Sequence, residues 1–171
     1  MSVLLYLMRH GIAAEPSPGT SDAERALTAE GVRKTARVAV GLQAIDAKPD
    51  LILSSPLVRA EETARLVADV LAPRAAVELY PPLAGGFSAA DIVKGLRPHR
   101  GVRELLLVGH QPDLGELASH LLTGSTTLAP LPFRKAGVAA ITLGAIPPRA
   151  LGVLEWFLTP NQLRAIASGR K

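Results

Sequence analysis

Short runs of uninterrupted apolar residues, separated by stretches of helical periodicity, limit most strongly how this chain can fold. The runs cover residues 3–8, 51–53 and 105–108, and turn residues bound each of them. Strands that lack polar alternation are covered on both faces, as in a mainly parallel sheet. Further strands are predicted at residues 138–143 and 151–158. The chain is therefore expected to build a sheet with two covered faces.

The segments between the runs carry helix signals. Thr28 and Ser88 are predicted as N-caps, and Ser55-Pro56 as an N-cap followed by proline at the first helical position. Helices are predicted over residues 28–43, 55–71, 88–96, 112–122 and 159–167. Alternating strands and helices with short connections predict an α/β fold. We expect one three-layer domain over residues 1–171, with a mainly parallel central sheet and helices on both faces.

Composition excludes several classes of protein. The 171 residues include no cysteine, so a disulfide framework, a thiolate metal site and a thiol nucleophile are all excluded. The amino-terminal apolar run is too short to span a membrane, and it has neither a preceding basic segment nor a cleavage pattern after it. We therefore expect a cytoplasmic chain with no membrane partner.

The net charge is +4, and the densest basic stretch covers residues 97–103. This stretch lies between periodic segments and has no aromatic residues of the kind that stack on bases. It is interpreted as a solvated loop, and no nucleic-acid partner is expected. An acidic or phosphorylated partner would suit the charge equally well.

Two predicted strands end in histidine, at His10 and at His110. Ligands collect at the carboxyl ends of strands in parallel sheets, so the spacing predicts that both imidazoles line one pocket. Arg59 lies in the first turn of a predicted helix, where free N–H groups favour an anion. Each residue alone also fits a structural role, as a core histidine or an arginine paired with Glu61 or Glu62. Their convergence at three strand ends indicates a phosphate site.

Four segments in this order resemble the histidine phosphatase superfamily, also called the phosphoglycerate mutase-like or RHG family. They read "LMRHG", "RALTAEG", "LSSPLVRAEETA" and "LVGHQP". The resemblance covers about residues 2 to 165. The chain length and the lack of a long insertion between Leu79 and Gly101 are most similar to the small bacterial SixA-type phosphohistidine phosphatases.

The resemblance implies that His10 is a nucleophile that forms a phosphohistidine intermediate. It further implies that Arg9, Arg59 and His110 hold the phosphoryl oxygens, with Arg25 as a further contributor. This agrees with the chemistry of the side chains, because a neutral imidazole with a fixed tautomer is nucleophilic at neutral pH. Guanidinium groups and an imidazole also supply the positive charge that phosphoryl transfer needs. Neither a metal nor another cofactor is expected.

The chain departs from the family at the general acid. Many members carry a glutamate in a stretch like Pro-Glu-Leu, and Pro82 stands at that position in "LYPPLAGG". Glu15, Asp22 or Asp91 can substitute for it, or each can be a solvated loop or cap residue. Phosphohistidine has a labile P–N bond and needs little acid help, so the departure favours it over phosphoserine or a sugar phosphate.

The preferred function is therefore a phosphatase that acts on phosphohistidine in a protein, such as a histidine-phosphotransfer domain of a phosphorelay. One alternative is a phosphatase of small phosphomonoesters such as sugar or nucleotide phosphates. A second is a phosphate-recognition module without enzymatic activity. We expect a monomer or a weak dimer that binds a phosphorylated protein.

Overall fold

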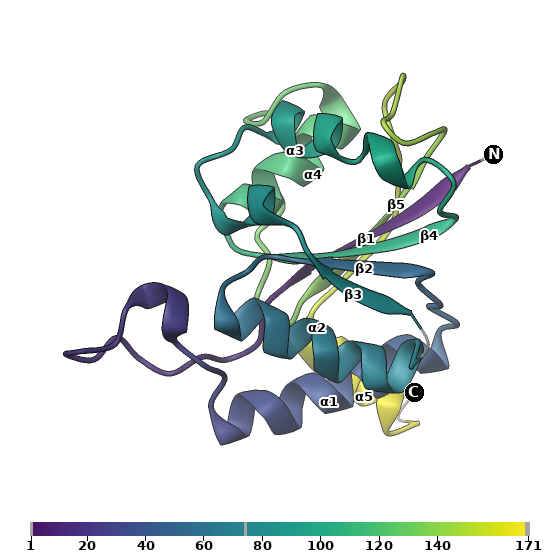
Figure 1. Ribbon diagram of the computed structural model, residues 1–171. Coiled ribbons are helices and arrows are strands. Elements are labelled where there is room, and N and C mark those ends of the chain that lie inside the picture. The colour runs from purple at the N-terminus through teal and green to yellow at the C-terminus, as the bar shows by residue number, and fades with distance from the viewer. Residues whose placement is uncertain (1, 74, 170–171) are drawn as a thin grey trace.

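Six strands form one sheet in the computed structural model, which describes residues 2–73 and 75–169 (Figure 1). They are β1 (Val3–Arg9), β2 (Leu51–Ser54), β3 (Ala76–Leu79), β4 (Glu104–Gly109), β5 (Val138–Leu143) and β6 (Val153–Leu158). The strand order is β3-β2-β4-β1-β5-β6. The first four strands in this order are parallel, whereas β5 runs antiparallel to both β1 and β6. The predicted mainly parallel sheet is confirmed.

The central strands are apolar on both faces because each face packs against helices. Along β1, Leu5 and Leu7 belong to the core on one side of the sheet, and Tyr6 and Met8 belong to the core on the other. These side chains alternate between the two sides because successive residues of a strand point to opposite faces. The absence of polar alternation in residues 3–8 is thus explained by two separate cores.

Helices α1 (Ala29–Ala44), α2 (Val58–Leu71) and α5 (Pro160–Ala167) cover one face, and α3 (Ala89–Gly95) and α4 (Asp113–Thr123) cover the other (Figure 1). Three short 3-10 segments complete the elements: η1 (Asp22–Glu24), η2 (Pro81–Ala84) and η3 (Arg97–His99). The N-caps predicted at Thr28 and Ser88 are confirmed, since both side chains accept hydrogen bonds from backbone N–H groups of the next turn. Within the described ranges, no helix has the length and apolarity needed to cross a lipid bilayer.

Two elements differ from the sequence predictions. Strand β3 was not predicted from the residues, because it is a sheet edge that is mostly exposed and therefore lacks an apolar run. Helix α2 begins at Val58 with Leu57 at the N-cap position, not at Ser55. The N–H of Ser55 instead donates to the carbonyl of Val108 at 2.9 Å, which continues the pairing of β2 with β4. The prediction of a Ser55 cap was therefore wrong.

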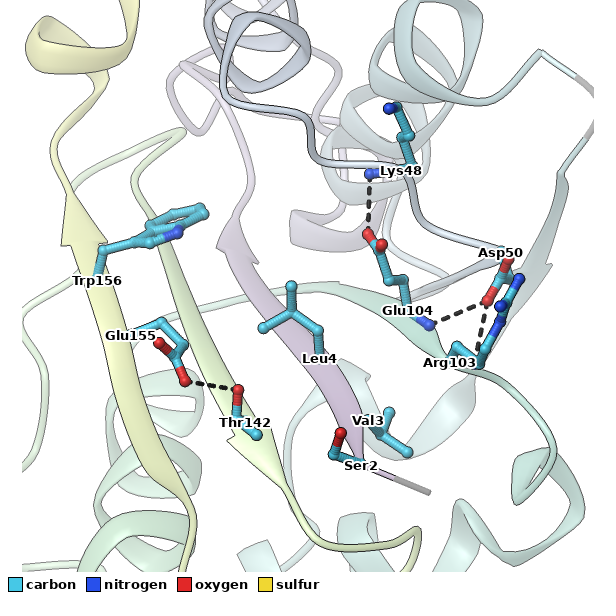
Figure 2. A pocket seen from close by; sticks show the side chains of 10 residues that line it. All are labelled: Ser2, Val3, Leu4, Lys48, Asp50, Arg103, Glu104, Thr142, Glu155 and Trp156. Atoms are coloured by element: carbon cyan, nitrogen blue, oxygen red, sulfur yellow. Dashed lines mark hydrogen bonds between the residues drawn. The ribbon is translucent and has the colours of Figure 1, made fainter.

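A hollow of about 680 Å³ lies at the edge of the sheet where β1 and β4 begin (Figure 2). Its polar groups bind one another. Glu104 accepts hydrogen bonds from the Tyr6 hydroxyl at 2.8 Å and from the Lys48 N–H at 2.9 Å. Asp50 accepts from the N–H groups of Arg103 and Glu104 at 3.0 Å each. These bonds tie the incoming loops to the sheet, so we interpret the hollow as structural.

Candidate active site

The carboxyl ends of β1, β2 and β4 meet at one edge of the sheet, where the predicted site residues gather. His10 directly follows β1, His110 directly follows β4, and Arg59 lies in the first turn of α2 after β2. The two imidazole rings have their centroids 5.1 Å apart, at an angle of 50°. The predicted proximity of these two histidines, one hundred positions apart in the chain, is thereby confirmed.

The His10 side chain is buried, with 6% of the residue exposed. Its Nδ1 lies 2.7 Å from the carbonyl oxygen of Gly11. A carbonyl only accepts hydrogen bonds, so Nδ1 carries the hydrogen and Nε2 keeps its lone pair. Burial lowers the pKa of His10 to about 3, and the positive groups around it act in the same direction. At neutral pH His10 is therefore an uncharged imidazole whose Nε2 is nucleophilic.

The turn that holds His10 is fixed by hydrogen bonds to strand β4 and helix α2. The His10 N–H donates to the Gly109 carbonyl at 3.0 Å, and the Gly11 N–H donates to the Thr63 hydroxyl of α2 at 3.0 Å. A Cβ on Gly11 would overlap the Thr35 hydroxyl of α1. Glycine is thus needed at this position for α1 to pack closely. The roles of both threonines were not anticipated, because a threonine in an amphipathic helix carries no distinctive sequence signal.

The Arg9 side chain is oriented by the segment that precedes β5. Its Nη1 donates to the carbonyl of Phe133 at 2.9 Å, across 124 positions of sequence. Its Nε is buried and has no acceptor among the described residues. Burial lowers the pKa of Arg9, yet a guanidinium stays protonated at neutral pH. One terminal nitrogen of this guanidinium is therefore held by the protein, and its Nε–H has no acceptor among the described residues.

Arg59 is buried and contacts η1, a segment for which no helix or strand was predicted. Its Nη1 donates to the backbone carbonyl of Asp22 at 2.6 Å, and its Nη2 pairs with the Asp22 carboxylate at 2.9 Å. The second carboxylate oxygen of Asp22 pairs with Nε of Arg25 at 2.9 Å. Arg59 holds the pKa of Asp22 below its ordinary value, so the carboxylate is ionised at neutral pH. Asp22 therefore bridges two of the arginines expected to bind phosphate.

His110 makes a contact that also explains the late start of α2. Its Nε2 lies 2.7 Å from the hydroxyl of Ser55, while its Nδ1 is buried without a partner among the described residues. Burial lowers the pKa of His110 to about 4, and the nearby Arg59 acts in the same direction. Ser55 thus orients this imidazole, which is uncharged at neutral pH, and does not cap the helix.

Acid is expected to destabilise the fold through these histidines. The ordinary histidine pKa of 6.5 applies to the unfolded chain, whereas the folded values are about 3 for His10 and about 4 for His110. Between these limits the unfolded chain binds more protons, so the free energy of unfolding falls as the pH falls. The midpoint of urea unfolding should therefore decrease from pH 6.5 to pH 4. The decrease should be shallower in His110→Gln than in the control His99→Gln, which replaces the half-buried histidine of η3; equal slopes would contradict this origin.

The residues considered in connection with the general acid lie on separate elements. Pro82 belongs to η2, Glu15 is exposed in the loop after His10, and Asp91 is exposed on α3. Another carboxylate, Asp113 in the first turn of α4, was not singled out from the sequence. Its Oδ2 lies 3.6 Å from the position that a Cβ on Gly85 would take, beside the loop that follows Pro82. Its position shortly after His110, a histidine at the end of a strand, is the sequence signal that could have identified it.

Two uncharged imidazoles and three guanidiniums at this edge give a site suited to a phosphoryl dianion, since planar guanidiniums bind phosphate oxygens in pairs. Positively charged donors fixed in place stabilise the charge of a transferring phosphoryl group. With the mainly parallel three-layer fold, this site defines a class of protein: phosphatases that work through histidine.

Comparisons with known proteins agree with this class. The model of the histidine phosphatase superfamily (branch 1) matches residues 5–84. An uncharacterized protein of Picosynechococcus is 36% identical over 165 residues, covering 90% of this chain and 93% of that protein. The phosphohistidine phosphatase SixA of Escherichia coli is 29% identical over 162 residues, covering 94% and 96%. A structure of SixA complexed with tungstate has a TM-score of 0.82 at 28% identity, covering 94% and 99%. The chain belongs to the histidine phosphatase superfamily, in its SixA-type branch, and is a phosphatase.

Proposed function

We propose that the protein transfers a phosphoryl group from phosphohistidine in a protein to Nε2 of His10 and then to water. Nε2 attacks phosphorus, the bond to the leaving imidazole breaks, and that imidazole takes up a proton. Water then attacks the phosphohistidine at His10, which releases inorganic phosphate and restores the free imidazole. The hydrogen bond from Nδ1 to the Gly11 carbonyl carries this proposal, because it directs the lone pair of Nε2 outward for attack.

Three buried donors support the roles proposed for the other residues. Nε of Arg9, Nε of Arg59 and Nδ1 of His110 are all buried without a partner among the described residues, and Nδ1 of His110 is a donor in the tautomer whose Nε2 accepts from the Ser55 hydroxyl. Buried donors are normally paired, because leaving one unpaired costs free energy. The three donors come from three different strand ends, and the phosphoryl oxygens would accept from them. Together they would neutralise the transferring group without a metal ion.

The leaving group decides the substrate class. Pro82 has no proton to donate, and an imidazole leaves more readily than an alkoxide. The name of SixA as a phosphohistidine phosphatase points the same way. A small phosphomonoester is the second candidate, and the position of the Asp113 carboxylate beside Gly85 favours it. Such a carboxyl group would protonate a leaving alkoxide.

A turnover panel tests the substrate class. The substrates are a phosphorylated histidine-phosphotransfer domain, a phosphoserine peptide and a sugar phosphate, each with and without a chelator. We expect kcat/KM to be highest for the phosphotransfer domain, with no effect of chelator or of Asp113→Asn on that substrate. A preference for the sugar phosphate that Asp113→Asn abolishes would establish the second candidate. Binding without turnover of any substrate would instead identify a recognition module.

Asp22 competes with a bound anion for Arg59 under this proposal. Replacing Asp22 with asparagine removes the negative charge and leaves the backbone carbonyl contact to Arg59 in place. The inhibition constant of inorganic phosphate should therefore fall, by about threefold to tenfold for an exposed carboxylate. Asp69→Asn, an exposed carboxylate on α2, should leave it unchanged. Weaker phosphate inhibition in Asp22→Asn would show that the carboxylate organises the arginines and does not compete.

A further inference from the structure

A cleft of about 1000 Å³ opens between α3, α4 and the loop that joins β5 to β6. Leu143, the last residue of β5, pairs with Val3 at the start of β1. The loop that follows Leu143 therefore lies where β1 begins, whereas His10 lies where β1 ends. The cleft is separate from the candidate active site, and no residue discussed there lines it.

The lining of this cleft is rich in cations. Four exposed cationic side chains and one half-buried histidine contribute, and we call their cavity the basic cleft: Lys94, Arg97, Arg100, Arg149 and His120. None of the described residues that line it is acidic. Within residues 2–73 and 75–169, none of these lysine and arginine side chains forms a salt bridge. No carboxylate in the described ranges therefore neutralises these charges.

The hollow in Figure 2 shows the opposite arrangement. There, the carboxylates of Glu104 and Asp50 are held by hydrogen bonds from the residues around them. That hollow contains both signs of charge, whereas the basic cleft contains one. A cavity lined by one sign of charge focuses the electrostatic potential and attracts oppositely charged ligands.

The cations reach the basic cleft from separate elements. Lys94 is on α3, Arg97 on η3, His120 on α4 and Arg149 on the loop between β5 and β6. Apolar groups form the rest of the wall, including the buried side chain of Ile146. A single carboxylate or phosphate group cannot contact all of these positive groups at once, because they are spread around the cavity. They match an anion that presents several phosphate groups.

We propose that the basic cleft binds a small ligand that carries two or more phosphate groups, either a nucleoside polyphosphate or an inorganic polyphosphate. Its volume lies within the range of small-molecule sites. The basic stretch 97–103, interpreted from the sequence as a solvated loop, supplies two of the cations through Arg97 and Arg100. This site is independent of the function proposed for His10, because it is assigned from other residues at another edge.

Isothermal titration calorimetry on the full chain tests the proposal. The probes are the β,γ-methylene analogue of ATP and methylenediphosphonate, neither of which can lose a terminal phosphoryl group by hydrolysis. Arg97→Gln and Arg149→Gln should each weaken binding about tenfold, since each removes a charge-assisted hydrogen bond. Arg33→Gln, an exposed arginine on α1, should have no effect. Arg59→Met should also leave binding intact, because Arg59 lies at the other edge.

The two probes also distinguish the two sources of phosphate. Tighter binding of the nucleotide analogue would indicate that the apolar wall takes the nucleoside, and equal binding would indicate an inorganic polyphosphate. Three results would overturn the proposal. These are no binding of either probe, loss of binding in Arg59→Met but not in Arg97→Gln, and equally tight binding of a polyglutamate peptide.

Discussion

A His10→Ala protein is expected to form no phosphoenzyme and to lose at least about 10⁴-fold in kcat/KM on phosphohistidine, as when a covalent nucleophile is removed. The physical reason is that Nε2 of His10 is the atom proposed to bond to phosphorus. The remaining donors can hold the phosphoryl group but cannot accept it. The measurement is the transfer of radioactive phosphate to the protein, combined with steady-state rates.

The label on the wild-type protein should be labile in acid and stable in alkali, as expected of a phosphoramidate. Because His10 is buried, alanine leaves a cavity, so the unfolding midpoint is measured alongside. His10→Asn, which keeps a polar side chain of similar size, should be equally inactive. His99→Ala, in η3, is the matched control and should retain full activity. Turnover or labelling that persists in both His10 variants would rule out the covalent mechanism.

Replacing Arg59 with methionine is expected to lower kcat/KM by about 10³-fold, comparable to the loss of an arginine that stabilises phosphoryl transfer. The variant keeps the aliphatic length of the side chain and removes its charge. Arg59 is 6% exposed, so little solvent screens its field at the site. The pKa of Asp22 should rise at the same time, because Arg59 holds it below its ordinary value.

Arg65→Met provides the control for Arg59, since Arg65 is exposed on the same helix and pairs with Glu61. It should change the rate by less than about twofold, as expected for a surface ion pair. The pKa of Asp22 can be followed by NMR in both variants. Equal rates in Arg59→Met and Arg65→Met would exclude Arg59 from phosphoryl transfer, while a raised Asp22 pKa in Arg59→Met would still confirm their contact.

Much of the fold was predictable because apolar pattern and capping chemistry are local. The strand at residues 138–143 and the caps at Thr28 and Ser88 agree with the structure. The edge strand β3 was not predictable in this way, because an exposed strand needs no apolar run. The capping prediction also failed at Ser55, whose hydroxyl contacts the distant His110 and a backbone N–H that precedes the helix. Local preference decides an element only where no distant partner competes for the same group.

The proximity of His10 and His110 was predictable from strand topology, because parallel strands share an edge. The bridge from Asp22 to Arg59 was not, since it depends on the path of a loop that has no periodic pattern. The unpaired Nε of Arg9 was also beyond the sequence, because it depends on the burial around the guanidinium. Sequence therefore indicates which groups meet, and the structure shows which of their hydrogen bonds remain unused.

The reversed direction of β5 has a consequence for biosynthesis. Because β5 runs opposite to β1, the segment that precedes it, and not the one that follows it, lies beside Arg9 and supplies the Phe133 carbonyl. A nascent chain that has emerged only as far as α4 therefore carries every residue proposed for phosphoryl transfer but lacks the acceptor that orients Arg9. This edge of the sheet is therefore completed by a segment that emerges from the ribosome long after His10, the proposed nucleophile.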